Sequence, residues 1–321
     1  MYKIYNIYRL YYEWWKNLDK VIFFLIIILF SLGLFFSLVS TSLIASDKLN
    51  TNSYYFFLRH LFYTFIAFFF IIFFSSLNEN NLYKLSVILF FICFAFLAMV
   101  PFIGIEVKGS KRWIDFLFLP RFQPIEILKP FIIIIIASIL SSENNKGIYY
   151  KYFLSFILII PIIFFLITQP DIGQTFLVIL TWLSLIFISG INLIIFFIFF
   201  GLMLLLLFYL IFFVPKFSYI LIRIKSFFDP TSGNNYQSEK ASEAIINGGF
   251  FGKGIGEGVL KNRVPEAHTD YIVSVISEEF GAIVVISLMV IFLIFIYRVF
   301  KRLYFETNNK VKLILVGSAS I

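Results

Sequence analysis

The sequence has little of what a soluble domain or a metalloprotein requires. Charged residues make up 14% of its 321 residues, whereas soluble globular domains carry about 25%. It has one cysteine, Cys93, which lies in an apolar run, and two histidines, His60 and His268. A single cysteine excludes an intrachain disulfide, and so few cysteines and histidines exclude a metal cluster built from them.

Hydrophobic residues are abundant instead. They make up 61% of the chain, and the mean hydropathy is +0.96, which indicates a polytopic membrane protein because only about half of a soluble domain is apolar. The formal net charge is +8, but most lysines and arginines flank the apolar runs, as the positive-inside rule describes. The charge therefore indicates orientation in a membrane and contact with membrane lipid, and it does not indicate a nucleic-acid partner.

Long apolar runs predict an all-α fold, a polytopic integral membrane bundle. The run from Val21 is too long for a signal peptide, so residues 1–20 are expected to form a cytoplasmic N-terminal tail. Residues 21–214 would hold helices 1–7, residues 215–270 a large extracytoplasmic loop, and residues 271–321 helix 8, a cytoplasmic loop and the start of helix 9. The eight full spans are predicted at 21–45, 55–75, 82–105, 123–141, 152–168, 174–190, 191–214 and 271–297.

One polar stripe marks the start of the eighth predicted helix. At 100° per residue, Asp270, Ser274, Ser277 and Gly281 share this stripe, and Glu278 lies beside it. Glu278 would lie about 12 Å deeper than Asp270, where an unpaired charge costs about 2.5–3.5 kcal/mol. We therefore expect Glu278 to have a partner inside the bundle.

Two cations near the external ends of helices are candidate partners for internal acids. Arg59 lies about one turn inside the second predicted span, and we expect it to pair with Glu126, Glu278 or Glu279. Lys129 follows Glu126 by three residues, which is the spacing of an intrahelical ion pair. Arg59 and Lys129 are thus expected to hold these acids in place.

Two helices that face the exterior begin alike. Gln123-Pro124 precedes Glu126, and Gln169-Pro170 precedes Asp171. Proline in a first turn costs no hydrogen bond, and an acid there is favoured by the helix dipole. The pattern fits simple N-terminal capping and a functional role for the acids equally well.

The glycine-rich stretch at 247–258 also has two interpretations. It lacks the preceding strand and the Gly-Lys-Ser/Thr ending of a nucleotide-binding loop. Its backbone amides could bind a pyrophosphate. Alternatively, its glycines could let the loop fold tightly against the membrane.

Five segments, in this order, resemble the motifs of the SEDS family of peptidoglycan glycosyltransferases, also named the RodA/FtsW/SpoVE family. Within the family, the division group (FtsW) is a closer likeness than the elongation group (RodA). The likeness runs from the first helix to the end of the sequence. The segments are 109–114, 123–130, 169–175, 248–254 and 265–271.

This resemblance implies a function and partners. The family polymerises lipid II into glycan strands at the outer face of the cytoplasmic (inner) membrane and releases undecaprenyl pyrophosphate. Its division group acts at the septum with a class B penicillin-binding protein, an FtsI-like transpeptidase, and with other divisome proteins. The family has ten helices, so the sequence is expected to lack most of the ninth and all of the tenth.

The resemblance also implies site residues. Asp270 matches the family's essential aspartate, which implies a catalytic role, and Ile125 stands where the family usually has serine. No metal-binding residues are predicted, and the one cofactor to consider is a divalent cation such as Mg²⁺ or Mn²⁺. The positions that match residues lining or supporting the family's central cavity are Arg59, Trp113, Glu126 and Lys129. Further candidates for substrate binding or cavity support are Lys111, Arg112, His268, Thr269, Glu278 and Glu279, with Gly252, Lys253 and Gly254 in the loop.

Three other functions stay open: an elongation-type polymerase, a lipid II flippase and a non-catalytic divisome scaffold. A flippase would carry substrate past its intramembrane charges and would show inverted repeats with broken helices. The two Gln-Pro helix starts share one orientation, and the 215–270 loop has no second copy. Reconstitution with purified lipid II distinguishes these functions, because only a polymerase makes glycan strands.

Overall fold

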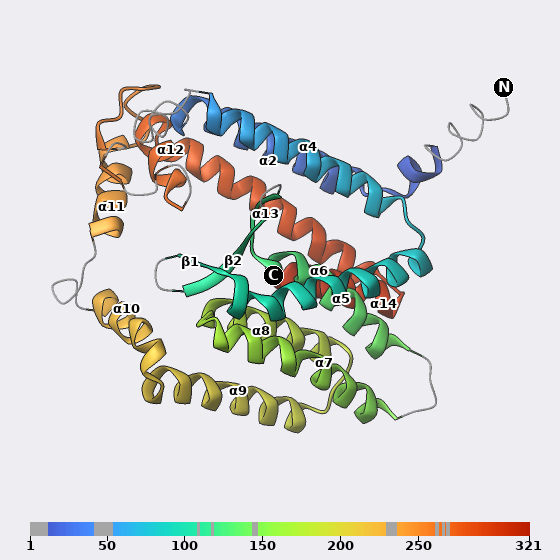
Figure 1. Cartoon of the computed structure of the whole chain (residues 1–321). Helices are drawn as coiled ribbons and strands as arrows, with labels where there is room; N and C mark the ends of the chain where they lie inside the picture. Colours follow the sequence, from blue (N-terminus) through green and yellow to red (C-terminus); the bar gives the residue numbers. More distant parts are fainter. Residues whose placement is uncertain are drawn as a thin grey trace. The chain divides into compact units, whose positions relative to one another are not determined.

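The chain divides into two compact units (Figure 1). The computed structural model describes residues 12–41, 54–107, 110–116, 119–142, 147–228, 236–260, 263–264, 267 and 270–321. The first unit contains residues 1–77 and 225–300, and the second unit contains residues 78–224 and 301–321. Helix α10 (Ser218–Phe228) runs from the second unit into the first.

Seven helices in the described part of the chain are long and apolar enough to cross a membrane. An eighth apolar helix, α8, has 17 residues. The prediction of a polytopic helical membrane protein is confirmed, with seven helices of spanning length and one shorter helix in place of eight full spans. The seven are Lys20–Val39, Tyr55–Ser75, Glu79–Ile103, Pro124–Ser141, Ile148–Thr168, Leu193–Phe213 and Ala282–Phe305.

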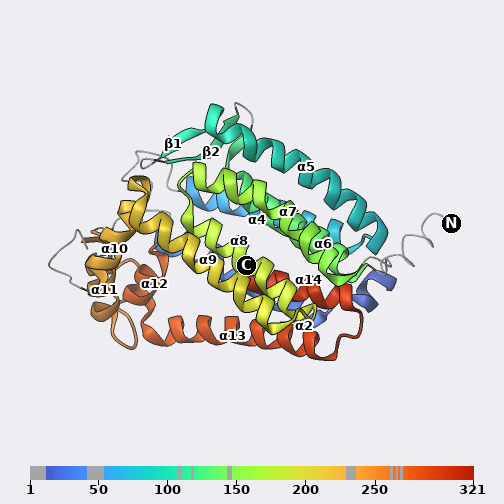
Figure 2. The same ribbon diagram turned by 90° about the horizontal axis from the view of Figure 1, so that it is seen from below.

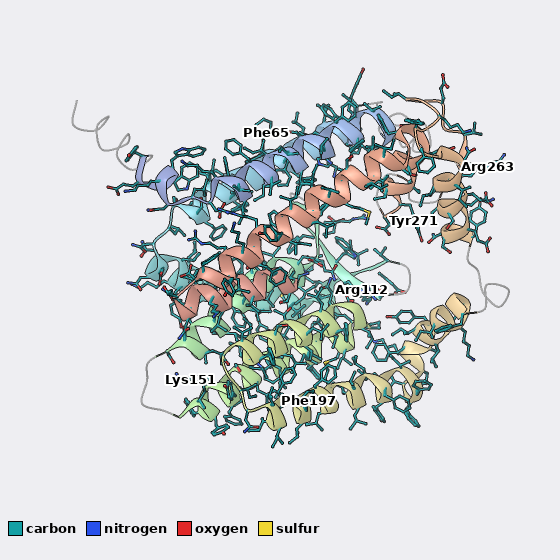
Figure 3. All side chains as sticks on the ribbon, turned by 180° about the vertical axis from the view of Figure 1, so that it is seen from behind. Phe65, Arg112, Lys151, Phe197, Arg263 and Tyr271 are labelled. Atoms are coloured by element: carbon teal, nitrogen blue, oxygen red, sulfur yellow. The ribbon has the colours of Figure 1, made fainter. Side chains whose placement is uncertain are left out.

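The first unit contains helices with mostly exposed apolar faces. None of the 24 residues of α13 is buried, and α4 buries only Thr64. Phe65, in the middle of α4, is 68% exposed and points away from the chain (Figure 3). Such faces require a lipid environment. The elements of this unit are α2 (Lys20–Phe36), the π-helix η1 (Ser37–Thr41), α4 (Tyr55–Ser75), α11 (Tyr236–Gly248), α12 (Ile272–Phe280) and α13 (Ala282–Phe305), whose residues 301–305 belong to the second unit.

The second unit is built around α6. This helix packs against α5, α7, α8 and α14, as the views of Figures 1 and 2 show, and most of its residues are buried. The buried Trp182 indole donates to Ser155 Oγ at 3.0 Å and joins α7 to α8. The helices of this unit are α5 (Glu79–Ile103), α6 (Pro124–Ser141), α7 (Ile148–Thr168), α8 (Ile172–Ile188), α9 (Leu193–Phe213), the 3-10 helix η2 (Pro215–Phe217) and α14 (Asn309–Ser320).

A small antiparallel sheet lies between the predicted spans 82–105 and 123–141. Its strands β1 (Ile105–Val107), β2 (Ser110–Phe116) and β3 (Leu119–Phe122) pair in the order β1-β2-β3. Ile114 on β2 is 1% exposed, and β2 packs against α5 and α6. The sheet covers one end of the second unit, and the all-α prediction did not include it.

The predicted helix at 271–297 is wrong in one respect. Gly281 has a φ of +84°, outside the helical region, so the chain forms the nine-residue α12 and then the 24-residue α13. Asp270 precedes α12 and does not continue the stripe of Ser274 and Ser277. Within the predicted loop at 215–270, Tyr236–Gly248 form the helix α11.

Asp19 joins the two ends of the first unit's sequence. Its carboxylate caps α2 by accepting from the amide of Val21 at 3.1 Å, and Arg298 of α13 donates to it at 3.1 and 3.2 Å. Burial raises the pKa of Asp19, but the hydrogen bonds and the positive charge of Arg298 outweigh burial, so the pKa lies below its ordinary value.

We expect Asp19→Asn to lower the free energy of unfolding by about 1 kcal/mol at pH 7. A depressed pKa in the folded state gives stability that is present above the unfolded pKa of about 3.9 and is lost as the pH falls through the folded pKa. Thermal midpoints of parent and variant in detergent should therefore converge below about pH 4. A constant difference down to pH 3 would contradict the ion pair, and Asp115→Asn, which removes an exposed pair with Arg121, is the control.

Candidate functional site

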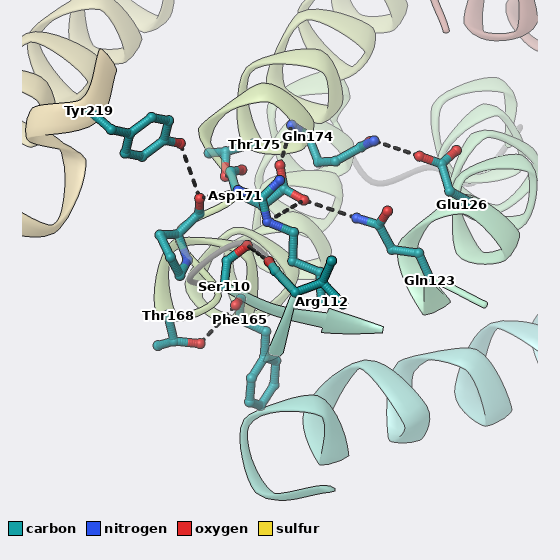
Figure 4. A network of polar contacts seen from close by, with 12 residues as sticks. Ser110, Arg112, Gln123, Glu126, Phe165, Thr168, Asp171, Gln174, Thr175 and Tyr219 are labelled. Atoms are coloured by element: carbon teal, nitrogen blue, oxygen red, sulfur yellow. Dashed lines mark hydrogen bonds and ion pairs between the residues drawn. The ribbon is translucent and has the colours of Figure 1, made fainter. Parts of the chain in front are cut away.

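A polar network joins the first turns of α6 and α8 in the second unit (Figure 4). Gln123 is the N-cap of α6, which has Pro124 in its first turn, and Asp171 is the N-cap of α8. The Asp171 carboxylate accepts hydrogen bonds from the backbone N–H of Gln174 at 3.3 Å and from Gln123 Nε2 at 2.9 Å. Asp171 therefore caps α8 and also takes part in the polar network.

Arg112 brings the sheet into this network. Its Nε lies 3.5 Å from Asp171 Oδ2, and its Nη2 donates to the Pro170 carbonyl at 2.8 Å. Tyr219 of α10 donates to the same carbonyl at 3.2 Å. Asp171 is 4% exposed, so the charge of Arg112 lies against a buried carboxylate, which is the arrangement that makes a buried acid tolerable.

Glu126 and Lys129 form the other end of the network. Lys129 Nζ lies 2.6 Å from Glu126 Oε2, which confirms the predicted intrahelical pair. Gln174 Nε2 donates to Glu126 Oε1 and links the two helix starts. The side chain of Lys129 is 7% exposed and that of Glu126 is 48% exposed, so the pair extends from the interior to an accessible carboxylate.

Three buried polar atoms near this network have no hydrogen-bond partner among the described residues. They are Arg112 Nε, Gln169 Oε1 and Gln174 Oε1. An unpaired buried donor or acceptor costs about 1–3 kcal/mol. The network therefore has capacity to bind water or a polar ligand. The sequence left capping and a functional role equally open for Asp171 and did not single out Gln123 or Gln174 as site residues, although the repeated Gln-Pro pattern was the available signal.

The glycine-rich stretch folds around the end of α12 in the first unit. The amide of Lys253 donates to the Glu278 carbonyl at 2.9 Å, and that of Gly254 donates to the Glu279 carbonyl at 3.1 Å. The amide of Gly256 donates to the Glu279 carboxylate at 3.2 Å. The stretch therefore folds tightly against α12, since the amides of Lys253, Gly254 and Gly256 bond to these two acids. Tight folding against the membrane stays a prediction.

Glu278 receives its hydrogen bonds from the same loop. Its Oε1 accepts from the Leu260 amide at 2.9 Å and from Asn247 Nδ2 at 3.1 Å, and it is fully buried. Glu278 therefore has hydrogen-bond partners, but they belong to the 215–270 loop and not, as predicted, to the interior of the helical bundle. Arg59 instead lies over Tyr63, with its guanidinium carbon 5.7 Å from the ring centroid. For the described contacts, the prediction that Arg59 pairs with Glu278 or Glu279 is wrong, because the loop supplies their donors.

Asp270 lies in an exposed turn just before α12. A small apolar core of Ala244, Val264, Ala267 and Val275 lies beneath this region, with Tyr271 packed against it. The predicted site residues His268 and Thr269 lie outside the described residues. Lys111 and Trp113 are exposed on β2, and Lys253 is exposed in the glycine-rich loop.

The described residues contain no group of three or more His, Cys, Asp or Glu side chains that could hold a metal ion. The adjacent acids Glu278 and Glu279 are buried and accept hydrogen bonds from the loop. A requirement for a divalent cation such as Mg²⁺ or Mn²⁺ therefore stays a prediction, and the proposed reaction does not depend on one.

Comparisons with known proteins agree on one family. The family model described as "Cell cycle protein" (FtsW/RodA/SpoVE) matches residues 19–321. The chain is 30% identical over 289 residues, 89% of its length and 72% of the relative's, to "Probable peptidoglycan glycosyltransferase FtsW" of Caulobacter vibrioides. It is 34% identical over 281 residues, 84% and 74% of the two chains, to the Coxiella burnetii protein of the same name.

Solved structures show the same fold. A chain from a peptidoglycan synthase complex, described as coordinating polymerization and crosslinking, has a TM-score of 0.68 and 22% identity over 95% of this chain and 83% of that chain. The rod shape determining protein RodA of Thermus thermophilus has a TM-score of 0.59 and 20% identity, covering 95% and 82%. At these identities the likeness concerns the fold alone.

The unequal exposure of Glu126 and Lys129 predicts unequal effects of removing either one. Glu126→Gln leaves a buried ammonium without its counter-charge and should lower the free energy of unfolding by about 3 kcal/mol. Lys129→Met leaves a half-exposed carboxylate that water can solvate, so the cost should be below about 1 kcal/mol. Thermal midpoints of both variants in one detergent measure this order. A larger loss for Lys129→Met would show that the Glu126 carboxylate is the more deeply buried partner.

Proposed function

We propose that this chain, which belongs to the FtsW/RodA/SpoVE family of cell cycle proteins, is a peptidoglycan glycosyltransferase that polymerises lipid II during septal cell-wall synthesis. The observation that carries the proposal is identity of 30% or more, over more than four fifths of the chain, to proteins named "Probable peptidoglycan glycosyltransferase FtsW". The division-group name of these relatives favours septal synthesis over the elongation role.

Asp270 is the proposed general base. Its carboxylate takes the proton of the C4 hydroxyl of one lipid-linked N-acetylglucosamine while that oxygen attacks C1 of the N-acetylmuramic acid of a second lipid-linked chain. The new O4–C1 bond forms as the bond from C1 to the pyrophosphate oxygen breaks, and undecaprenyl pyrophosphate leaves with the electron pair. Attack opposite the leaving group inverts C1, so one base suffices and no second nucleophilic carboxylate is required.

Structural features support this assignment. Asp270 is exposed, as a residue that meets a substrate must be, and it lies two residues before a helix whose Val275 and Ile276 are buried. Glu278 and Glu279 are buried in hydrogen bonds to the loop and are therefore proposed as structural residues. Lys111, Arg112 and Lys253 are proposed to bind anionic groups of the substrate or product.

The network of Arg112, Asp171, Gln174, Glu126 and Lys129 is proposed to support the substrate cavity of the second unit. Gln169 Oε1 and Gln174 Oε1, two buried acceptors without a hydrogen-bond partner among the described residues, could accept from sugar hydroxyls or ordered water. A class B penicillin-binding protein is the proposed partner, because one structural neighbour is a chain of a peptidoglycan synthase complex. The proposed location is the inner membrane at the division septum.

The proposed orientation places the N-terminus in the cytoplasm and residues 215–270 outside. Contacts inside the first unit agree with alternating helices, since Trp14 donates to Ser75 Oγ at one end and Phe36 meets Phe280 at the other. With Cys93 buried, Ser238→Cys should react with an impermeant maleimide on intact spheroplasts, and Ser76→Cys only after permeabilisation. The reverse pattern would overturn the orientation.

We expect Asp270→Asn to lower the rate of lipid II polymerisation about 10²–10⁴-fold, because it removes the base and keeps the size of the side chain. The assay uses the purified protein with its partner in liposomes and follows glycan strands by gel. Glu239→Gln, which neutralises an exposed acid of α11 in the same loop, is the matched control and should keep the parent rate.

Parent-like polymerisation by Asp270→Asn would refute the catalytic assignment and leave Asp270 as an acid at a helix start. Translocation of lipid II by the parent without polymer would favour a flippase. If the parent shows no polymer and no translocation in the presence of the partner, a scaffold function would be favoured.

A further inference from the structure

Two adjoining depressions lie at the end of the second unit opposite to the sheet. The first lies among α5, α6 and α7 and is lined by Tyr83, Ser138, Ser142, Lys151 and Leu154. The second lies among α6, α7, α8 and α14. Lys151 and Ser142 line both, and the two depressions together are here called the lysine depression. The other polar residues of the second part are Ser141, Ser189, Asn309 and Lys312.

The lysine depression is large enough for a ligand. Its two parts have cavity volumes of about 200 and about 320 Å³, whereas one water occupies about 30 Å³ in the liquid. A phosphate with several attached atoms therefore fits in either part.

The charge in the depression is positive. Lys151 and Lys312 line it, and Lys310 lies 5.4 Å from the ring centroid of Tyr83, which lines it too. No aspartate or glutamate is among the described residues that line either part. Lys151 donates one hydrogen bond to the Ser142 carbonyl at the end of α6, and an ammonium has two further donors. The chemistry therefore suits an anion.

An apolar track leads away from the depression along α7. Tyr150, Phe153, Leu154 and Ile157 are 45%, 61%, 39% and 47% exposed, and their spacing places them on one helix face. Leu154 also lines the depression. Lys151 stands at the end of this helix in Figure 3. A ligand with an anionic head and an apolar tail matches this arrangement, whereas a free inorganic anion would use only the lysines.

We propose that the lysine depression binds the phosphate headgroup of an anionic glycerophospholipid, with an acyl chain lying along the exposed face of α7. Basic pockets between transmembrane helices are suited to such headgroups, and each lysine near an anionic lipid surface contributes about 1 kcal/mol. The site is separate from the network at the starts of α6 and α8, since it lies at their other ends. It makes the packing of α14 against α6 and α8 dependent on the surrounding lipid.

The test titrates the purified full chain in dodecyl maltoside with dioleoylphosphatidylglycerol and follows the thermal midpoint by tryptophan fluorescence. The parent should show a saturable rise with phosphatidylglycerol and none with dioleoylphosphatidylcholine or with inorganic phosphate at equal concentration. The double variant Lys151→Gln/Lys312→Gln should need about 30-fold more phosphatidylglycerol for the same rise, since it loses two lysines.

The control Lys16→Gln/Lys301→Gln removes two exposed lysines outside the depression and should titrate as the parent does. If loss of Lys151, which holds the end of α6, prevents folding, Lys312→Gln alone tests the site. This single variant should need about fivefold more phosphatidylglycerol than the parent for the same rise. Equal responses to the two lipids, an equal loss in the control, or an unchanged Lys312→Gln titration would overturn the proposal. An equal response to inorganic phosphate would replace the lipid with a free anion.

Discussion

Burial of the adjacent carboxylates of Glu278 and Glu279 constrains the fold of the first unit. Two buried acids are tolerated only when hydrogen-bond donors surround them, and the loop before α12 supplies backbone amides and Asn247. For these amides to reach the acids, the loop must lie directly on the helix. A Cβ at Gly248 would stand 2.0 Å from the Ser277 carbonyl oxygen, and one at Gly252 would stand 2.2 Å from that of Glu279. Glycine is therefore needed at positions 248 and 252, because only glycine lets the loop come close enough to α12 to donate to the buried acids.

The same constraint separates α12 from α13. The amide of Ala282 donates to the Gly249 carbonyl, so the loop is bonded to the chain on both sides of Gly281. Gly281 adopts its left-handed conformation in contact with the Phe250 carbonyl, where a Cβ would lie 2.2 Å away. The short helix therefore belongs to the folded loop, while α13 begins as a separate apolar helix. Asp270 lies at the exposed start of the unit formed by the loop and α12. The buried acids Glu278 and Glu279 hold that loop against the helix.

The membrane-spanning helices could be predicted from the sequence, because a lipid environment demands long apolar runs. The break at Gly281 and the partners of Glu278 could not, because they depend on contacts between distant parts of the chain. Apolar runs located the helices because a membrane span must be continuous and apolar, and Gln123-Pro124 located the start of α6 because a first turn accepts proline. The break at Gly281 looked like one more residue of a helical stripe, since a single glycine carries little local signal. The donors of Glu278 come from residues 18 and 31 positions away, a pairing that spacing alone cannot reveal.

Ile125 shows how an apolar side chain packs beside the polar network. Its side chain is fully buried in α6, next to Glu126, which is half-exposed in the polar network. A serine at a fully buried position would need a hydrogen-bond partner for its hydroxyl, at a cost of about 1–3 kcal/mol if none were found. Isoleucine instead adds apolar contact where the helix is already enclosed. Ile125 therefore contributes to the packing behind the network, while Glu126 and Lys129 keep their own contact.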